Sequence, residues 1–198
     1  MSFKKTLLIT GFDPFGGESI NPSYEAIKDL PDLLGDCRII KLCVPTVFGE
    51  AVKTVLAEAE KYTPDIILCV GQAGGRKGVT PEAVAINLRD AKIPDNRGNT
   101  PVDTPCVADG PAAYFSTLPV KKMVNAIREL GIPSSLSYSA GTFVCNDLMY
   151  SLLHHYRDTK VLVGFIHVPF LPCQAKDTHP FLEKKQITAA LTAAISVL

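Results

Sequence analysis

The chain has 198 residues, 46% hydrophobic and 20% charged, and its 20 basic residues balance its 20 acidic ones. This length suits one domain over 1–198 with a sizeable core. Zero net charge offers nothing to attract nucleic acid, and no apolar run approaches the roughly 18–20 residues of a membrane span, so neither is expected as a partner.

Strand-like and helix-like runs alternate along the chain. Asn21 followed by Pro22 is typical of a helix start, and Gly131 with Pro133 is typical of a helix end. In chain order we expect a strand over 5–11, a helix from Asn21 to about Leu30, a strand over 38–44, a helix over 49–61, strands over 66–71 and 83–88, a helix from Val120 to about Gly131, a strand over 136–140, a helix over 145–157, a strand over 161–167 and a last helix to Leu198.

This alternation predicts an α/β fold. We expect a single-domain three-layer sandwich, in which helices cover both faces of a mainly parallel, twisted sheet. The loop over about 90–111 is too long for a mere connection, which favours a functional role. Sites in such sheets form at the carboxyl ends of the strands, so the candidate residues are sought there.

Two glycine-containing turns follow predicted strands. Gly11–Gly17 matches neither the P-loop nor the dinucleotide pattern, and its two phenylalanines favour the wall of an apolar pocket over a phosphate site. In Gly71–Gly78, four glycines allow the backbone to approach a ligand closely. Ordinary turns use the same residues, so a structural role remains an alternative for both segments.

The six cysteines include no CxxC pair, which argues against a zinc site and against a disulfide framework. Together with an N-terminus that lacks a signal-peptide cleavage site, this predicts a reduced, cytoplasmic protein. Cys145 stands apart because it follows the turn SAGTFV where a helix begins. The helix N-terminus should lower the pKa of this thiol and favour a nucleophilic thiolate, and its free N–H groups suit an oxyanion.

A thiol nucleophile needs a base, usually histidine. His154 and His155 lie on the predicted helix of Cys145, about 14–15 Å along its axis, which is too far to pair. His179 lies in a proline-flanked loop, whereas His167 ends a strand at the edge where sites form. The spacing therefore favours His167. It does not identify the carboxylate that would orient the imidazole, for which Glu82 and Asp95 are both candidates.

Six segments together resemble type I pyroglutamyl peptidase, also called pyrrolidone-carboxylate peptidase, and cover nearly the whole chain in the family's order. They are GFDPFGG, VGQAGGRKGVTPEAVAIN, IPDNRGNTPVD, DGPAAYFSTLP, SAGTFVCNDLMY and GFIHVPFLP. The resemblance implies a cysteine peptidase that removes an N-terminal pyroglutamyl residue from peptides through a thioester. It also implies an α/β fold, no cofactor or metal, and a homotetramer.

The resemblance assigns the nucleophile to Cys145, the base to His167 and the orienting carboxylate to Glu82. It also implies a pyroglutamate pocket made by Phe12, Phe15, Gln72, Ile93, Phe143 and Val144. The family usually has arginine in ARIPDN, where this chain has Lys92. Lysine keeps the charge but loses the planar, five-donor fork, so a bidentate role at this substrate-binding position is in doubt.

Two other functions are weighed against this one. A glutaminase-like thiol acyltransferase would use the same nucleophile and base. A non-enzymatic phosphate- or nucleotide-binding module would use the glycine-rich loops, but the P-loop and dinucleotide patterns are missing.

Overall fold

The computed structural model describes residues 4–176 and 179–198. Its centre is a six-stranded sheet in the order β2-β3-β1-β4-β8-β5. The strands of this sheet are β1 (Lys5–Phe12), β2 (Leu33–Leu34), β3 (Cys37–Val44), β4 (Ile66–Gln72), β5 (Thr80–Glu82) and β8 (Leu162–Val168). Strands β3, β1, β4 and β8 are parallel, while β2 and β5 pair antiparallel at the two edges.

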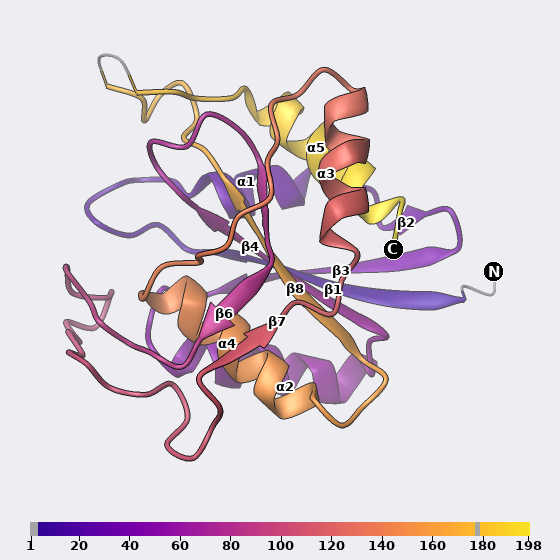
Figure 1. The fold of residues 1–198 in the computed structure, drawn as a ribbon. Coiled ribbons are helices and arrows are strands. Elements are labelled where there is room, and N and C mark those ends of the chain that lie inside the picture. Colours follow the sequence, from indigo (N-terminus) through magenta and orange to yellow (C-terminus); the bar gives the residue numbers. More distant parts are fainter. Residues whose placement is uncertain (1–3, 177–178) are drawn as a thin grey trace.

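Helices cover both faces of this sheet, as Figure 1 shows. They are α1 (Pro22–Lys28), α2 (Glu50–Tyr62), α3 (Val120–Glu129), α4 (Val144–Tyr156) and α5 (Lys184–Ile195). Helices α1, α3 and α5 lie on one side, and α2 and α4 lie on the other (Figure 1). The predicted α/β fold, a mainly parallel sheet between two helical layers, is confirmed. Within residues 4–176 and 179–198, no helix is long and apolar enough to span a membrane.

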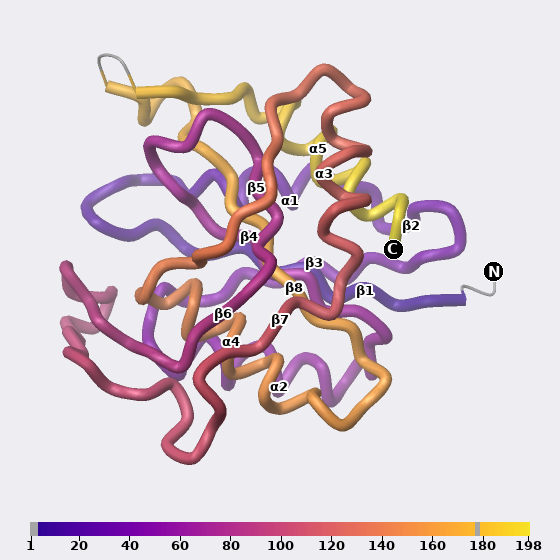
Figure 2. The backbone as a smooth tube through the Cα atoms, viewed as in Figure 1, coloured from indigo at the N-terminus to yellow at the C-terminus, as the bar shows by residue number. Residues whose placement is uncertain are grey.

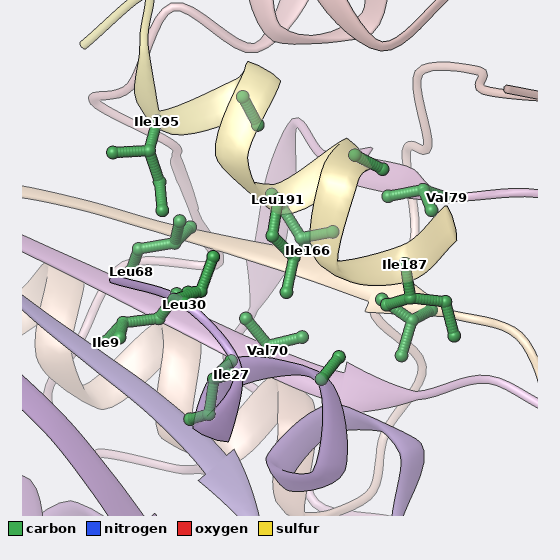
Figure 3. Close-up of a cluster of buried hydrophobic side chains, with 14 of the residues drawn as sticks. Ile9, Ile27, Leu30, Leu68, Val70, Val79, Ile166, Ile187, Leu191 and Ile195 are labelled. Carbon is green, nitrogen blue, oxygen red and sulfur yellow. The ribbon is translucent and has the colours of Figure 1, made fainter. Parts of the chain in front are cut away.

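The alternation of side chains along the strands divides the core into two clusters. In β4, Leu68 and Val70 face α1, α3 and α5, while Ile67 and Cys69 face α2 and α4. Figure 3 shows the first cluster, in which Leu191 of α5 packs over the sheet. Because the central strands are buried on both faces, their sequences are nearly continuous apolar runs, which is why the patterning locates them.

Two predicted strands differ from the observed ones. The run 83–88 is a short strand, β6 (Val84–Ile86), which pairs with β7 (Ala113–Phe115) in a separate two-stranded sheet. The segment 136–140 is not a strand, although it extends beside β5 through an isolated bridge between Glu82 and Ser137. Its serine hydroxyls accept hydrogen bonds from nearby backbone N–H groups, which compete with a regular ladder.

The long loop after β6 is fixed at several points, and Figure 2 shows that it projects from the body of the fold beside α4. Asp90 and Thr142 exchange hydrogen bonds of 3.0 and 2.7 Å, which attach the loop to the segment before α4. The backbone N–H of Asn96 donates a hydrogen bond to the Thr46 carbonyl. The loop is therefore held against the carboxyl edge of the sheet, where a site is expected.

Candidate active site

A cavity of about 420 Å³ lies at the carboxyl ends of β1, β4 and β8. The residues that line it are Phe12, Phe15, Asn21, Thr46, Gln72, Ala73, Arg76, Ser139, Ala140, Gly141, Phe143, Cys145 and His167. It includes six of the predicted site residues, from four different parts of the chain. The parallel strands deliver these residues to one edge, as the expected topology requires.

Cys145 is the second residue of α4, whose N-cap is Phe143. Its sulfur lies against the end of β4: a methyl group added at Gly71 would lie 2.8 Å from Sγ and 2.8 Å from the Phe165 ring. Gly71 is thus required because the strand and the thiol approach too closely for a side chain. The early N–H groups of α4 have no intrahelical partner, which leaves them available for an anion.

His167 and Glu82 form a direct, buried contact. His167 lies on β8 and Glu82 on β5, and the antiparallel register of Thr80 opposite His167 puts both side chains on the same face. The Nδ1 atom of His167 lies 2.7 Å from Glu82 Oε1, and the two residues are 4% and 0% exposed. The carboxylate therefore fixes the orientation of the imidazole ring, leaving the other ring nitrogen for chemistry.

Arg76 is a residue of this site that the sequence reasoning missed. Its Nη1 lies 2.6 Å from Glu82 Oε1, the same oxygen that His167 contacts, and also hydrogen-bonds Thr80. Its Nη2 donates to the Ser139 carbonyl at 3.0 Å. The available signal was a cationic residue inside the glycine-rich segment after β4, but no pattern indicated which carboxylate it would meet.

Burial and charge act in opposite directions on these groups. Burial alone would raise the pKa of Glu82, but the hydrogen bond and charge of His167, with help from Ser137 and Arg76, hold it below its ordinary value. Burial lowers the pKa of His167 despite the neighbouring carboxylate, and Arg76 lowers it further. At neutral pH the site therefore holds an ionised Glu82 beside a neutral imidazole.

The expected low pKa of Cys145 is wrong. Apart from its contact with the cavity the thiol is enclosed by protein, and this burial, with the charge of Glu82, raises its pKa to about 12. The free-energy cost of removing a thiolate from water is larger than the stabilisation that one helix N-terminus gives to the thiolate. The resting pair is thus a neutral thiol and a neutral imidazole, and the proton has to move when a substrate is attacked.

The aromatic residues form a connected wall. Phe143 packs on Phe15 at 6.2 Å between ring centroids and meets Phe48 edge-on at 5.2 Å. Phe12 is buried behind them against Phe165. These contacts give the cavity a largely apolar side, and Phe48 supports that side without having been predicted.

Three predicted pocket residues are not on the cavity wall. Val144 is fully buried, because its side chain turns from the start of α4 into the core. Lys92 and Ile93 lie on the surface of the long loop, and Ile93 is 47% exposed. Gln72 does line the cavity, and its side-chain oxygen accepts a hydrogen bond of 3.0 Å from Gln174.

The other candidate residues have different roles. The Asp95 carboxylate accepts hydrogen bonds from the backbone N–H groups of Phe48, Arg97 and Asn99, so it shapes the long loop. His154 contacts the Tyr114 hydroxyl at 2.9 Å, away from the cavity. Asp95 is therefore committed to the loop backbone, whereas Glu82 contacts His167.

Comparison with known proteins places this arrangement in a family. Residues 5–198 match the family described as pyroglutamyl peptidase. The chain is 56% identical over 178 residues to a pyrrolidone-carboxylate peptidase of Escherichia fergusonii, covering 89% of this chain and 83% of that one. It is 50% identical over 198 residues to a pyrrolidone-carboxylate peptidase of Bacillus mycoides, covering 98% and 92% of the two chains.

Solved structures agree. Pyroglutamyl peptidase I from Bacillus amyloliquefaciens matches with a TM-score of 0.95 at 47% identity, over 98% of this chain and 96% of that chain. A mutant pyrrolidone carboxyl peptidase from the hyperthermophile Pyrococcus furiosus matches with a TM-score of 0.93 at 40% identity, over 97% of each chain. This chain therefore belongs to the pyroglutamyl peptidase family of cysteine peptidases.

Proposed function

We propose that this protein is a cysteine exopeptidase that hydrolyses the amide bond following an N-terminal pyroglutamyl residue. The observation that carries the proposal is the joint placement of Cys145 and His167 in one largely apolar cavity, with His167 held by Glu82. Membership of the pyroglutamyl peptidase family supports the same reaction. The substrates are peptides, and the reaction needs no cofactor or metal.

The chemistry follows from the protonation states. As Cys145 Sγ attacks the pyroglutamyl carbonyl carbon, its proton passes to the free ring nitrogen of His167. Glu82 stabilises the imidazolium that forms, and the backbone N–H of Cys145 donates to the oxyanion. The imidazolium then protonates the leaving amine. Water, deprotonated by His167, hydrolyses the thioester and regenerates the thiol.

Selectivity is expected from charge rather than from shape alone. Pyroglutamate is a neutral lactam, and the wall of Phe12, Phe15 and Phe143 suits its apolar ring face. Among the described residues that line the cavity, none is a carboxylate, while Arg76 is cationic. An ordinary N-terminal ammonium would therefore lose its hydration without an anionic partner, a cost of several kcal/mol.

The proposal is tested by release of a chromophore from a pyroglutamyl amide. Cys145→Ala should abolish turnover while the circular dichroism spectrum is unchanged, whereas Cys37→Ala, at the far end of β3, should keep wild-type rates. Matched glutaminyl and prolyl amides should react at least about 100-fold more slowly. Retention of more than a few per cent activity in Cys145→Ala, or hydrolysis of a glutamine side chain instead, would refute the assignment.

Three broader expectations belong with this proposal. We infer that residues 1–198 act as one catalytic domain, that it assembles as a homotetramer, and that it works in the cytoplasm. The cytoplasm keeps cysteine thiols reduced, which suits a thiol nucleophile and supports the location. Phe115 and Val102 are strongly exposed apolar side chains, which supports burial between subunits. Sedimentation velocity would give the oligomeric state directly.

A further inference from the structure

A second hollow, of about 590 Å³, adjoins the reactive cavity and shares Arg76 and Ser139 with it. One side of this groove is the loop around Lys77, and the other is the segment 133–139. Figure 2 shows that segment passing beside β5, in agreement with its bridges to Val79 and Glu82. A chain that left the reactive cavity past Ser139 would enter the groove directly.

The segment 133–139 lines this groove and has an open backbone edge on its side away from β5. The N–H groups of Ser135 and Ser137 donate to the carbonyls of Val79 and Pro81, so they point toward β5. In an extended chain the intervening residues direct their N–H and C=O groups to the opposite side. Those residues are Leu136 and Tyr138, both of which line the groove, and within 4–176 and 179–198 their backbone groups have no hydrogen-bond partner.

We propose, resting on the proposed peptidase function, that this groove binds the residues that follow pyroglutamate in the substrate. They add as an extended strand to the edge at Tyr138 and Leu136, a mode that other proteins use to bind peptides. The pyroglutamyl ring enters beside Ser139, and the chain continues toward Ser134. The substrate strand therefore runs antiparallel to 134–139, and every second residue pairs with the edge.

The charge of the groove suits an acidic peptide. Arg76 and Lys77 line it, and no described lining residue is a carboxylate. Ser134 also lines it, and the buried Ser134 hydroxyl has no hydrogen-bond partner among the residues placed by the structure. An acidic side chain or a C-terminal carboxylate beyond pyroglutamate would meet Lys77, so such substrates are preferred over basic ones.

The backbone pairing is tested with substrates alone, which avoids any folding defect. The specificity constant kcat/KM is measured for pyroglutamyl-alanine amides carrying one to five alanines. It should rise about three- to tenfold for each pairing residue and level off once the Leu136–Tyr138 edge is filled. Two further peptides carry an N-methyl group on the second or on the third amide after the scissile bond. One of them should lose about three- to tenfold in kcat/KM, because its N–H pairs with the edge, and the other should stay within twofold of the unmethylated peptide.

The charge preference is tested by Lys77→Glu, with Lys160→Glu as its control. Lys160 is exposed at the opposite end of the sheet, just before β8. Lys77→Glu should reverse the ranking of aspartate- and lysine-containing pyroglutamyl peptides by about tenfold. Lys160→Glu should retain the wild-type ranking.

The two proposals fail in different ways. If pyroglutamyl amides are cleaved but kcat/KM is independent of length, or if both N-methyl peptides react alike, the groove does not pair with substrate. If Lys77→Glu leaves the ranking unchanged, the charge preference is refuted. If no pyroglutamyl amide is cleaved at all, the peptidase function is wrong and the groove assignment falls with it.

Discussion

Glu82 is a buried carboxylate whose single oxygen Oε1 contacts both His167, at 2.7 Å, and Arg76, at 2.6 Å. Glu82 and Arg76 have opposite effects on the pKa of His167. Glu82 raises the pKa of His167 and so favours the imidazolium that forms during the reaction, while Arg76 lowers the same pKa. Arg76 is thus a positioning residue that adds to the effect of His167 on the Glu82 pKa and to the effect of burial on the His167 pKa.

Removing the arginine charge should shift the acidic limb of the pH profile of kcat/KM, which is the pH range in which kcat/KM falls as the base is protonated. In Arg76→Gln the pKa of His167 rises, because a cation that lowered it is gone, so kcat/KM starts to fall at a higher pH than in the wild type. Misplacement of Glu82 should also lower kcat, by up to about 100-fold. Arg76→Lys keeps the charge and should retain the wild-type limb, and an unshifted limb in Arg76→Gln would contradict this role.

Glu82→Gln should shift the same limb in the opposite direction. Loss of the carboxylate lowers the pKa of His167, so the limb moves to lower pH while kcat drops by about 10- to 10⁴-fold. KM should change little, since Glu82 is fully buried and contacts the base rather than the cavity. A rise in KM with unchanged kcat would make Glu82 a substrate-binding residue.

Sequence reasoning at this scale works best where a residue's place in an element limits its role. Cys145 follows a turn at a helix start and His167 ends a strand, and both line the cavity. Arg76 gave no comparable signal, because its partner Glu82 is six residues away across a glycine-rich loop. The pKa of Cys145 was misjudged because burial depends on the packing of β4 against α4, which no local pattern reveals.

The long loop after β6 lies outside the cavity wall and contacts it through Phe48, without lining the cavity. The Asp95 carboxylate holds the loop in place by accepting hydrogen bonds from the backbone N–H groups of Arg97 and Asn99 in the loop and of Phe48 outside it. Phe48 in turn packs edge-on against Phe143 of the cavity. The Asp95 carboxylate therefore connects the loop to Phe48 behind the cavity wall, although Asp95 itself does not line the cavity.

Asp95→Ala should loosen this connection. It leaves three backbone N–H groups without their acceptor, and the free energy of unfolding should fall by about 1–3 kcal/mol. Because Phe48 loses its anchor, KM for a pyroglutamyl amide should rise several-fold, with a smaller effect on kcat. Asp109→Asn, at an exposed position of the same loop, should change neither quantity; equal KM values in Asp95→Ala and the wild type would show that the loop does not shape the cavity.

The elements were predictable in proportion to their burial. The apolar runs of β1, β4 and β8 locate the central strands within a residue or two, and the Asn21 cap locates the start of α1. Strand β5 has only three residues and includes Pro81, so neither its existence nor its antiparallel direction was apparent. These short edge elements depend on tertiary pairing, and they are also the ones that carry Glu82 and border the groove.

At the scale of the whole molecule, the site makes folding sensitive to acid. Above pH 6.5 His167 is neutral in both the folded and the unfolded chain, so it has no effect there. Below that value the unfolded chain takes up a proton that buried His167, with its lowered pKa, does not. The unfolded state is thereby favoured as the pH falls, until the folded pKa is reached. Glu82 and Asp95, whose pKa values are lowered from 4.5 and 3.8, add a second loss at lower pH.

The free energy of unfolding should therefore fall from pH 6.5 toward pH 5, before the carboxylates titrate, with a slope of at most about 1.4 kcal/mol per pH unit from this one proton. Urea unfolding at fixed protein concentration measures it. His167→Gln removes the titrating group and should flatten the profile in this window, while leaving the steeper loss below about pH 4.5. His155→Gln, an exposed histidine on α4, should reproduce the wild-type slope. Equal slopes in the wild type and His167→Gln would mean that the buried imidazole does not couple folding to acid, and that the acid sensitivity arises from other groups.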